Sequence, residues 1–503
     1  MKFSILSIFL WLVFVSLFGQ SRLTTSFNSH WSFNKSDIVL ASQESYDDSS
    51  WNIVSLPHTW NDKDVLPDGD RGYYRGVGWY RKHISIPDNK LSKRFYLHFE
   101  GAGQLLKLYV NGELVGSHIG GYSAFTFDIT KFLREGDNVL AIRLDNTPNS
   151  DIAPLSADFT FFGGIYRDVF LIETDPVHFE MLDYGSSGIY IQTPKVSQNS
   201  SSVKVKGTVR NDSDTNKKID VKVSVYDGSH VRVAQIQKKL KIAAQDQSVF
   251  ELSKSDLQNI HLWSPKSPNL YTAEVQVLDN GKVLDEVIEK FGFRWFHFDA
   301  KEGFFLNGKP LKLMGANRHQ DYWGLGNALS DDLHRSDLQL LKQMGGNFIR
   351  LAHYPQDPAV LGAADELGLL VWEETPLVNE VTLSQQHDDN AEVMLKEMIR
   401  LHYNHPSVIL WGYMNEIYWA HRFLSDTIVD KHTEATVALA KRLEKVAREE
   451  DPDRYTAMAL HNYPLYEESG LDEIPMVVGW NLYHGWYYDT YEGFGRFMDV
   501  QHK

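Results

Sequence analysis

The sequence predicts a multidomain fold in which two all-β sandwiches precede a (β/α)8 barrel that is present only in part. Three observations support this prediction. A length of 503 residues suggests about three domains of ~150 residues each. Up to Phe291, short segments of alternating hydrophobicity are separated by turn residues, which is typical of β-sandwiches. After Phe291, strand-like and helix-like segments alternate, which predicts a parallel sheet.

The first 20 residues, MKFSILSIFLWLVFVSLFGQ, have the pattern of a secretory signal peptide. One lysine precedes an apolar run from Ile5 to Phe18, which is too short for a comfortable membrane span. We therefore expect residues 1–20 to be removed and the protein to be secreted or periplasmic, with an uncleaved anchor as the alternative. The chain has no cysteine, so burial rather than disulfides must stabilise the exported protein.

Residues 21–177 are predicted to form the first β-sandwich, and residues 178–292 the second. In the first, the segments 94–101, 105–112 and 138–146 alternate apolar and polar residues, and Asn111-Gly112 favours a two-residue hairpin turn. The second has similar segments at 202–211, 219–228 and 271–281, with a proline-rich loop at 261–271. Its length and strand spacing are typical of an immunoglobulin-like sandwich.

Residues 293–503 are predicted to form the β/α domain. Its strands are too apolar to be exposed on either face, as in barrels and doubly wound sheets. No glycine-rich phosphate fingerprint follows the first strand, so a barrel is favoured. Six β/α units are present where a closed barrel needs eight, so we expect the domain to be incomplete at its C-terminus. The predicted strands are 311–317, 347–354, 369–375, 408–416, 455–460 and 476–483, and the predicted helices are 330–344, 358–367, 391–403, 426–449 and 491–500.

Polar side chains gather where these six strands end. The C-terminal rim is where barrels build their active sites, whereas simple solvation would also place polar residues at the opposite ends. We therefore predict a functional site at this rim. The residues concerned are Asn317, Arg318, His319, Asp321, Arg350, His353, Glu373, Glu374, Asn415, Glu416, His461, Asn462, Asn481, Tyr483 and Trp486.

The residue types at the rim favour glycoside hydrolysis. No Ser-His-Asp pattern stands out there and no cysteine exists, so carboxylates supply the reactive groups. Glycosidases use one carboxylic acid to protonate the leaving oxygen and a second carboxylate opposite it. Glu416 lies near Trp411, Tyr413 and Trp419 in the sequence, and desolvation by aromatic rings would raise its pKa as a general acid requires. The structural alternative is an acidic residue at a helix N-terminus.

Seven motifs, spread over nearly the whole mature chain, resemble those of glycoside hydrolase family 2, the family of β-galactosidases and β-glucuronidases. The resemblance implies a jelly-roll sugar-binding domain, an immunoglobulin-like domain and a TIM barrel, in that order. The motifs are LPHTWND (56–62), GVGWYRK (76–82), DFTFFGGIYRDV (158–169), NRHQD (317–321), RLAHYP (350–355), WGYMNE (411–416) and NLYHGWY (481–487).

The resemblance also assigns roles to individual residues. Glu416 matches the general acid/base. Substrate contacts are implied for the 2-hydroxyl-binding Asn415, for Asp158 reaching over from the first domain, and for His353 and His319. Tyr483 matches a tyrosine that hydrogen-bonds the nucleophile, and Trp486 matches either a sugar platform or a core residue. For the others the alternative is a structural role, such as a loop cap or a rim histidine.

Several expectations concern catalytic and metal-binding groups of the family that do not occur in this sequence. The family's nucleophile, a second glutamate, lies beyond strand six, so we expect it beyond Lys503 and expect this chain alone to be inactive. Glu373 or Glu374 as nucleophile is the less favoured alternative, since strand three adjoins strand four; orienting Arg350 or His353 suits them better. The segment WEETPLVNE (372–380) lacks the Glu-x-His pair that binds magnesium in family β-galactosidases, and His402 and His405 have only weak metal-like spacing, so we predict no metal and no cofactor.

The resulting prediction is a retaining exo-β-glycosidase, with β-galactosides as the favoured substrates because of the segment NRHQDYWGLGNALS (317–330). A β-glucuronidase of the same family and a catalytically dead carbohydrate-binding fragment are the alternatives. The net charge of −16 argues against nucleic acid or an anionic membrane as a partner. The oligomeric state stays open, with a homo-oligomer compatible with the sequence.

Overall fold

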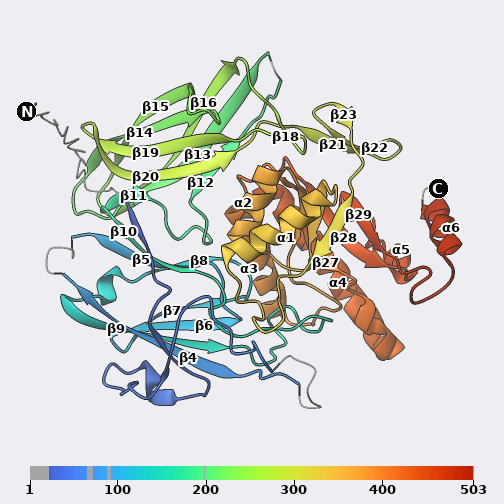
Figure 1. The fold of residues 1–503 in the computed structure, drawn as a ribbon, viewed down its shortest axis with the longest axis horizontal. Coiled ribbons are helices and arrows are strands. Elements are labelled where there is room, and N and C mark those ends of the chain that lie inside the picture. The colour runs from blue at the N-terminus through green and yellow to red at the C-terminus, as the bar shows by residue number, and fades with distance from the viewer. Residues whose placement is uncertain (1–21, 65–71, 88–91, 198, 502–503) are drawn as a thin grey trace, which may run out of the picture.

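A computed structural model of the protein describes residues 22–64, 72–87, 92–197 and 199–501. The two β-sandwiches lie on one side of the molecule and the β/α domain on the other (Figure 1). The predicted signal peptide, residues 1–20, lies outside the described residues. Within the described ranges, no helix is long and apolar enough to cross a membrane.

The first domain is a sandwich of two antiparallel sheets, with strand orders β1-β10-β5-β8 and β3-β2-β4-β9-β6-β7. Its core is rich in aromatic side chains, among them Trp31, Tyr80 and Phe99. The hairpin predicted at Asn111-Gly112 joins β6 to β7, and both turn residues have positive φ angles. The elements are β1 (Leu23–Ser26), β2 (Trp31–Asn34), η1 (Val39–Ser42), β3 (Asn52–Val54), β4 (Val77–Ile86), β5 (Arg94–Phe99), β6 (Leu105–Val110), β7 (Glu113–Ile119), β8 (Phe125–Asp128), η2 (Thr130–Phe132), β9 (Gly136–Asp145) and β10 (Val169–Thr174).

The second domain also consists of two antiparallel sheets. One has the order β11-β13-β12 with β16 paired to β13, and the other has the order β15-β14-β19-β20. Alternate residues of β14, including Val221 and Val223, point into a core built mainly of valine and isoleucine. The elements are β11 (Val177–Phe179), β12 (Ile189–Gln192), β13 (Ser201–Asn211), β14 (Lys217–Tyr226), β15 (Arg232–Ile242), β16 (Asp246–Leu257), β19 (Tyr271–Asp279) and β20 (Lys282–Phe291). The loop predicted at 261–271 contains a short hairpin of β17 (Trp263–Ser264) and β18 (Ser267–Pro268).

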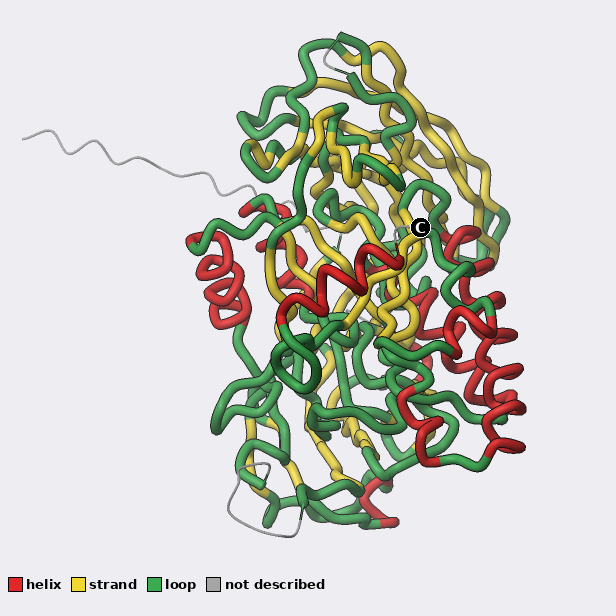
Figure 2. The backbone as a smooth tube through the Cα atoms, turned by 90° about the vertical axis from the view of Figure 1, so that its right-hand side faces the viewer, coloured by secondary structure: helices red, strands yellow, loops and turns green. Residues whose placement is uncertain are grey.

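The third domain contains six parallel strands, paired in sequence order from β24 to β29. A small antiparallel sheet of β21, β22 and β23 precedes them in the chain. Helices lie to the left and to the right of the strands in Figure 2. The strands are β21 (Phe296–Asp299), β22 (Gly303–Leu306), β23 (Lys309–Pro310), β24 (Gly315–Arg318), β25 (Phe348–Leu351), β26 (Leu370–Glu374), β27 (Val408–Asn415), β28 (Tyr455–His461) and β29 (Val477–Asn481). The helices are α1 (Asp331–Gln343), α2 (Pro358–Leu367), α3 (Gln385–Leu401), η3 (Trp419–Phe423), α4 (Asp426–Glu450), α5 (Leu465–Ser469) and α6 (Tyr491–Gln501).

The β/α elements follow the predicted order with three differences. α3 begins at Gln385 rather than at residue 391, because its polar first turns contact the first domain, where Asn390 donates to the Asp151 carbonyl at 2.7 Å. β24 begins at Gly315 rather than at residue 311, because Leu311 at the start of the predicted strand donates its N–H to the Phe304 carbonyl of β22 at 2.9 Å. The one-turn helix α5 was not predicted, because five residues are too few to show a helical period.

The six strands do not close into a barrel. Within the described residues, β24 and β29 each pair with one neighbour and leave a free edge. Apolar side chains flank this gap on both sides: Met314 and Met344 are exposed beside β24, and Phe494 and Val500 of α6 are exposed beyond β29. The third domain therefore has the six strands predicted from the sequence, and it presents an open side.

Arg167 joins the first domain to the β/α domain. Its buried guanidinium donates to the carbonyls of Glu100 and Tyr122 within the first domain. It also donates across the interface to Gln320 Oε1 at 3.1 Å and to the Pro355 carbonyl at 2.8 Å. These four bonds hold the 158–167 segment over the C-terminal ends of the parallel strands.

Replacing Arg167 by Met should lower stability by about 3–5 kcal/mol, because four buried acceptors lose a charged donor at once. The control is Lys445→Met, which breaks only an exposed pair with Glu449 on α4 and should cost under about 0.5 kcal/mol. Urea unfolding followed by tryptophan fluorescence measures both variants. Equal midpoints for the two variants would contradict the docking role of Arg167.

Candidate active site

A cavity of about 470 Å³ opens at the C-terminal ends of the parallel strands. Residues 157–160 of the first domain form one of its walls. Six of the seven predicted site residues line it, namely Asp158, His319, His353, Asn415, Glu416 and Tyr483. Trp486 does not line the cavity; its side chain is 81% exposed in the loop after β29.

Glu416 follows the last residue of β27 and has a φ of 48°, in the left-handed region that a glutamate rarely adopts. Its backbone N–H donates to the Ala459 carbonyl of β28 at 2.8 Å, which fixes the turn. Burial raises the pKa of Glu416 above its ordinary value. A hydrogen bond from Asn481 Nδ2 to Oε1, at 2.6 Å, opposes that rise, and the charge of Asp158 adds to it. The arrangement favours a carboxyl group that holds its proton more readily than an ordinary glutamate does.

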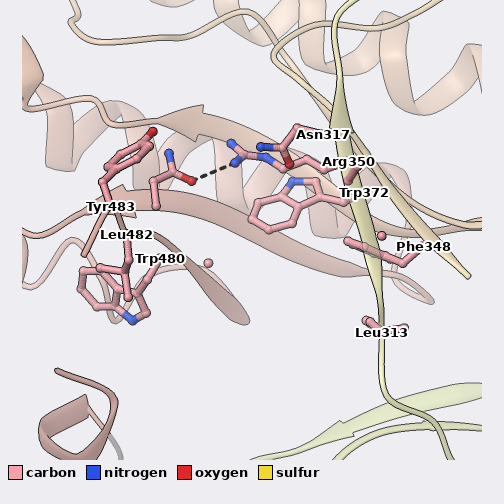
Figure 3. A pocket seen from close by; sticks show the side chains of 12 residues that line it. Leu313, Asn317, Phe348, Arg350, Trp372, Trp480, Leu482 and Tyr483 are labelled. Carbon is pink, nitrogen blue, oxygen red and sulfur yellow. Dashed lines mark hydrogen bonds between the residues drawn. The ribbon is translucent and has the colours of Figure 1, made fainter. Parts of the chain in front are cut away.

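Arg350, on β25, connects four strands beneath this carboxyl group. Its Nε donates to Glu374 on β26, Nη1 donates to Asn481 on β29 at 2.9 Å, and Nη2 donates to Asn415 on β27 at 2.7 Å. The dashed line in Figure 3 marks the bond to Asn481. Burial alone would raise the pKa of Glu374, but the charge of Arg350 and the bond to His353 bring it below its ordinary value. Glu374 is therefore ionised and holds Arg350 in place, in agreement with the prediction that it orients Arg350 or His353.

Asn415 presents its amide to the cavity in a fixed orientation. Its Oδ1 accepts from both Arg350 and Asn481, so Nδ2 is the atom left to donate to a ligand. Within the described part of the chain, no protein acceptor is bonded to that Nδ2. A donor held in this way suits recognition of a sugar hydroxyl.

The two predicted histidines form a second wall. His353 Nδ1 lies 2.7 Å from Glu374 Oε2, and His319 Nδ1 lies 3.1 Å from the Tyr354 hydroxyl. Burial, with the nearby His353, lowers the pKa of His319 to about 4, so this ring is neutral at physiological pH. Phe159 of the first domain packs against both rings, with centroid distances of 5.3 and 6.2 Å.

Glu373 does not belong to this site. Although it stands beside Glu374 in sequence, its fully buried side chain points to the other face of the sheet and lies 2.8 Å from His402 Nδ1. His405 pairs with Asp365 instead of joining His402 around a metal. In the described ranges, no three His, Cys, Asp or Glu side chains lie close enough together to hold a metal ion.

A second opening of about 420 Å³ lies between the two free sheet edges. Trp480, Leu482 and Tyr483 line one side, and Leu313 and Phe348 line the other (Figure 3). Asn317, Arg350, Asn481 and Tyr483 line both openings, so the catalytic face of the sheet is continuous with the gap.

Some residues of the cavity were given no individual role from the sequence, although they lie in the predicted rim or in a recognised motif. Asn481 contacts Glu416 directly, and its position at a strand end was the only signal. Phe159, Trp419 and Asp321 also line the cavity. Trp419 was expected near Glu416 and Phe159 follows Asp158 in a recognised motif, but only the docking of the first domain shows that Phe159 forms part of the cavity wall.

The domain order and the carboxyl–amide pair at the barrel rim define a protein of the glycoside hydrolase class. The comparisons with known proteins agree. Three family models match consecutive parts of the chain: the sugar-binding domain of glycosyl hydrolases family 2 over residues 24–175, glycosyl hydrolases family 2 over residues 188–294, and its TIM-barrel domain over residues 299–490. The chain belongs to glycosyl hydrolases family 2, which confirms the family predicted from the motifs.

A beta-glucuronidase of Bacteroides fragilis is 34% identical over 99% of this chain and 68% of its own length. A putative beta-glucuronidase of Formosa agariphila is 37% identical over 98% of this chain and 58% of its own length. The crystal structure of Bacteroides uniformis beta-glucuronidase matches with a TM-score of 0.93 and 42% identity, over 96% of this chain and 57% of that one. This chain thus spans 58% and 68% of the length of these two curated relatives and 57% of the crystallised one.

Beta-galactosidases also occur among the matched relatives. The relatives described above are named beta-glucuronidases, so the preference for β-galactosides predicted from residues 317–330 is not supported over its alternative. A further structure is a calcium-binding mutant of Bacteroides uniformis beta-glucuronidase 2, in which two aspartates 26 positions apart are changed to alanine.

Replacing Asn481 by Leu should raise the pKa of Glu416, because the carboxylate loses the donor that stabilises its charged form. Replacing Asp158 by Asn should lower that pKa, because a neighbouring negative charge is removed. Carbon-13 NMR titration of the glutamate carboxyls measures both, with Glu416→Gln identifying the signal.

The control is Asn462→Leu, an exposed position after β28, which should leave the titration unchanged. Shifts of the same sign in the Asn481 and Asp158 variants would show that the pKa of Glu416 follows general disturbance of the site rather than these two contacts.

Proposed function

We propose that this chain carries the acid/base half of a retaining exo-β-glycosidase site that acts on β-glucuronides. The observation that carries the proposal is Glu416, a half-buried carboxyl group of raised pKa at the end of β27, beside the oriented amide of Asn415. The relatives named beta-glucuronidases support the choice of sugar. β-Galactosides are the second candidate, supported by the beta-galactosidases among the relatives.

In the proposed reaction, Glu416 donates its proton to the glycosidic oxygen while the bond from that oxygen to the anomeric carbon breaks. A second carboxylate attacks the anomeric carbon and forms a glycosyl ester. Glu416, now ionised, takes a proton from water as the water displaces the ester and restores both carboxyl groups. Asn415 Nδ2 donates to a hydroxyl of the same sugar.

We propose that the second carboxylate comes from two further β/α units that fill the gap between β29 and β24. The exposed Met314, Met344, Phe494 and Val500 that flank this gap support the proposal, since exposed apolar clusters mark docking surfaces. Glu374 is a poor substitute, because it is buried and already engaged by Arg350 and His353. Without such units, the chain would bind sugar without hydrolysing it.

The exo-action follows from the first domain. Asp158, Phe159 and Thr160 close one wall of the cavity, which supports binding of a terminal residue rather than the interior of a polysaccharide. Asp158 is placed to accept from the outer hydroxyls of that residue. Export to the periplasm or beyond the cell is part of the proposal and depends on the signal peptide predicted at residues 1–20.

Glu416→Gln should reduce turnover of glycosides with poor leaving groups by about 10²–10⁴-fold, because the leaving oxygen is no longer protonated. Added azide should restore turnover of 4-nitrophenyl glycosides and give the β-glycosyl azide, since this small nucleophile needs no general base. Rates are measured on 4-nitrophenyl β-D-glucuronide and β-D-galactoside, with the chain joined to the two further units. Glu468→Gln, an exposed change on α5, is the control, and an unaffected rate in Glu416→Gln would refute the assignment.

We also propose a structural calcium ion where α1 and α2 begin. Asp331 and Asp357 have the same 26-residue separation as the two aspartates changed in the calcium-binding mutant of the relative. Glu100 and Asp168 of the first domain lie near them: burial and the charges of Asp357 and Asp168 raise the pKa of Glu100. A cation with a preference for several oxygen ligands would relieve this repulsion. The side chains do not converge on one point, so binding requires the exposed Asp331 side chain to turn inward.

Calcium in excess should raise the thermal midpoint, because a ligand at 100 times its Kd stabilises the folded state by about 2.7 kcal/mol. Asp331→Asn should abolish most of this shift, whereas Asp332→Asn, the exposed neighbour on the first turn of α1, should keep it. Differential scanning calorimetry in CaCl₂ and in EDTA measures the shift. The same midpoint in both buffers would exclude the site.

A further inference from the structure

The rim of the cavity beside Glu416 carries an exposed arginine stacked on an aromatic ring. The helix η3 begins at Trp419, which lines the cavity, and the guanidinium of Arg422 lies 4.2 Å from the Trp419 ring centroid. Arg422 Nε donates to the Trp419 carbonyl at 2.9 Å, which keeps the guanidinium over the indole. Phe423 packs edge-on to the same indole and is 70% exposed. The result is an apolar platform with a fixed positive charge above it.

Arg422 differs from most arginines of this protein. The chain has 66 acidic and 50 basic residues, and arginines such as Arg350, Arg400 and Arg442 each contact at least one carboxylate. Among the described residues, no carboxylate lies within 4 Å of Arg422, and its Nη atoms donate to no protein group. Its two outer nitrogens are thus free to form a bidentate contact with an anion.

The direction of the proton transfer places the leaving group against this platform. In the proposed reaction the sugar contacts Asn415, His353 and Asp158, so we place the glycosidic oxygen and the group beyond it toward Trp419, which also lines the cavity. Trp419 is three residues after Glu416, and its N–H donates to the Glu416 carbonyl at 2.7 Å, which ties the platform to the acid/base turn. A leaving group bonded to the protonated oxygen therefore reaches the rim at η3.

A second aromatic pair faces the same rim from the end of β28. His461 and Tyr463 are stacked with centroids 5.7 Å apart and an interplanar angle of 11°. The Tyr466 hydroxyl is 3.0 Å from His461 Nδ1. Burial, together with the charge of Arg422, lowers the pKa of His461 to about 4, so this ring is neutral and Arg422 is the positive group of the rim.

We propose that Trp419, Arg422 and Phe423 form a leaving-group subsite that selects aglycones with a flat ring and an anionic substituent, such as a carboxylate or sulfate. The inference rests on the proposed function, because it takes Glu416 as the residue that faces the leaving oxygen. The ring of the aglycone packs on Phe423 and the exposed edge of Trp419, and the anion accepts from both Nη atoms of Arg422. The substrates would then be conjugates or glycans whose second unit is acidic.

The test compares phenyl and 4-carboxyphenyl β-D-thioglucuronide, whose sulfur linkage resists hydrolysis, together with the matching β-D-thiogalactosides. Isothermal titration calorimetry measures their binding to the wild-type chain. We expect the carboxyphenyl compounds to bind about fivefold more tightly than the phenyl compounds, and the ratio to shrink at high salt. Arg422→Met, which keeps a flexible apolar side chain on Trp419, should bring the ratio to about one. Arg232→Met is the control, since Arg232 on β15 is also exposed and has no carboxylate partner among the described residues.

The outcomes separate the two proposals. Equal binding of the phenyl and carboxyphenyl compounds, or a preference that survives in Arg422→Met, overturns the aglycone subsite and leaves the sugar site intact. If none of the thioglycosides binds, and Glu416→Gln leaves glycoside turnover unchanged, both the proposed function and the aglycone subsite are overturned. A preference lost in Arg422→Met but kept in Arg232→Met supports both.

Discussion

The site depends on the buried guanidinium of Arg350. One planar group bonds to side chains on β26, β27 and β29 and so fixes the relative positions of Glu374, Asn415 and Asn481. Asn481 in turn orients Glu416, because its Nδ2 donates a hydrogen bond to Glu416 Oε1. A buried arginine is tolerable only when a carboxylate neutralises it, and Glu374 does so. The orientation of the Glu416 carboxyl group therefore depends on the Arg350–Glu374 ion pair, which does not have to contact the substrate.

The first domain contributes as much to the cavity as the barrel strands do. Arg167 holds the 158–167 segment at the rim, and Phe159 packs against the rings of His319 and His353. Burial raises the pKa of Glu416, and the charge of Asp158, which belongs to this segment, adds to the rise. The docking of the 158–167 segment through Arg167 thus affects both the size of the substrate that fits the cavity and the pKa of Glu416.

Three charged side chains near the cavity, Arg350, Asp158 and Arg422, have different effects on Glu416. Arg350 lies beneath it and favours its ionised form, whereas Asp158 opposes it from the facing domain. Arg422 stands farther out on the rim, where it is exposed and acts on whatever binds there. Because water screens the outer charge more than the inner ones, Arg422 can select ligands without greatly changing the acid/base group.

The sequence by itself determined the domain order, the six β/α units and the presence of polar residues at each strand end, because hydrophobic periodicity and turn residues are local properties. It also indicated Glu416, whose neighbours in sequence are its neighbours in space. It could not place Glu373, since adjacent strand residues point to opposite faces and one of the two had to leave the site. It could not show that Asn481 reaches Glu416 or that Trp486 stays outside the cavity, because these depend on how strands and loops far apart in the chain meet. Only the tertiary structure decided which of the rim residues share one pocket.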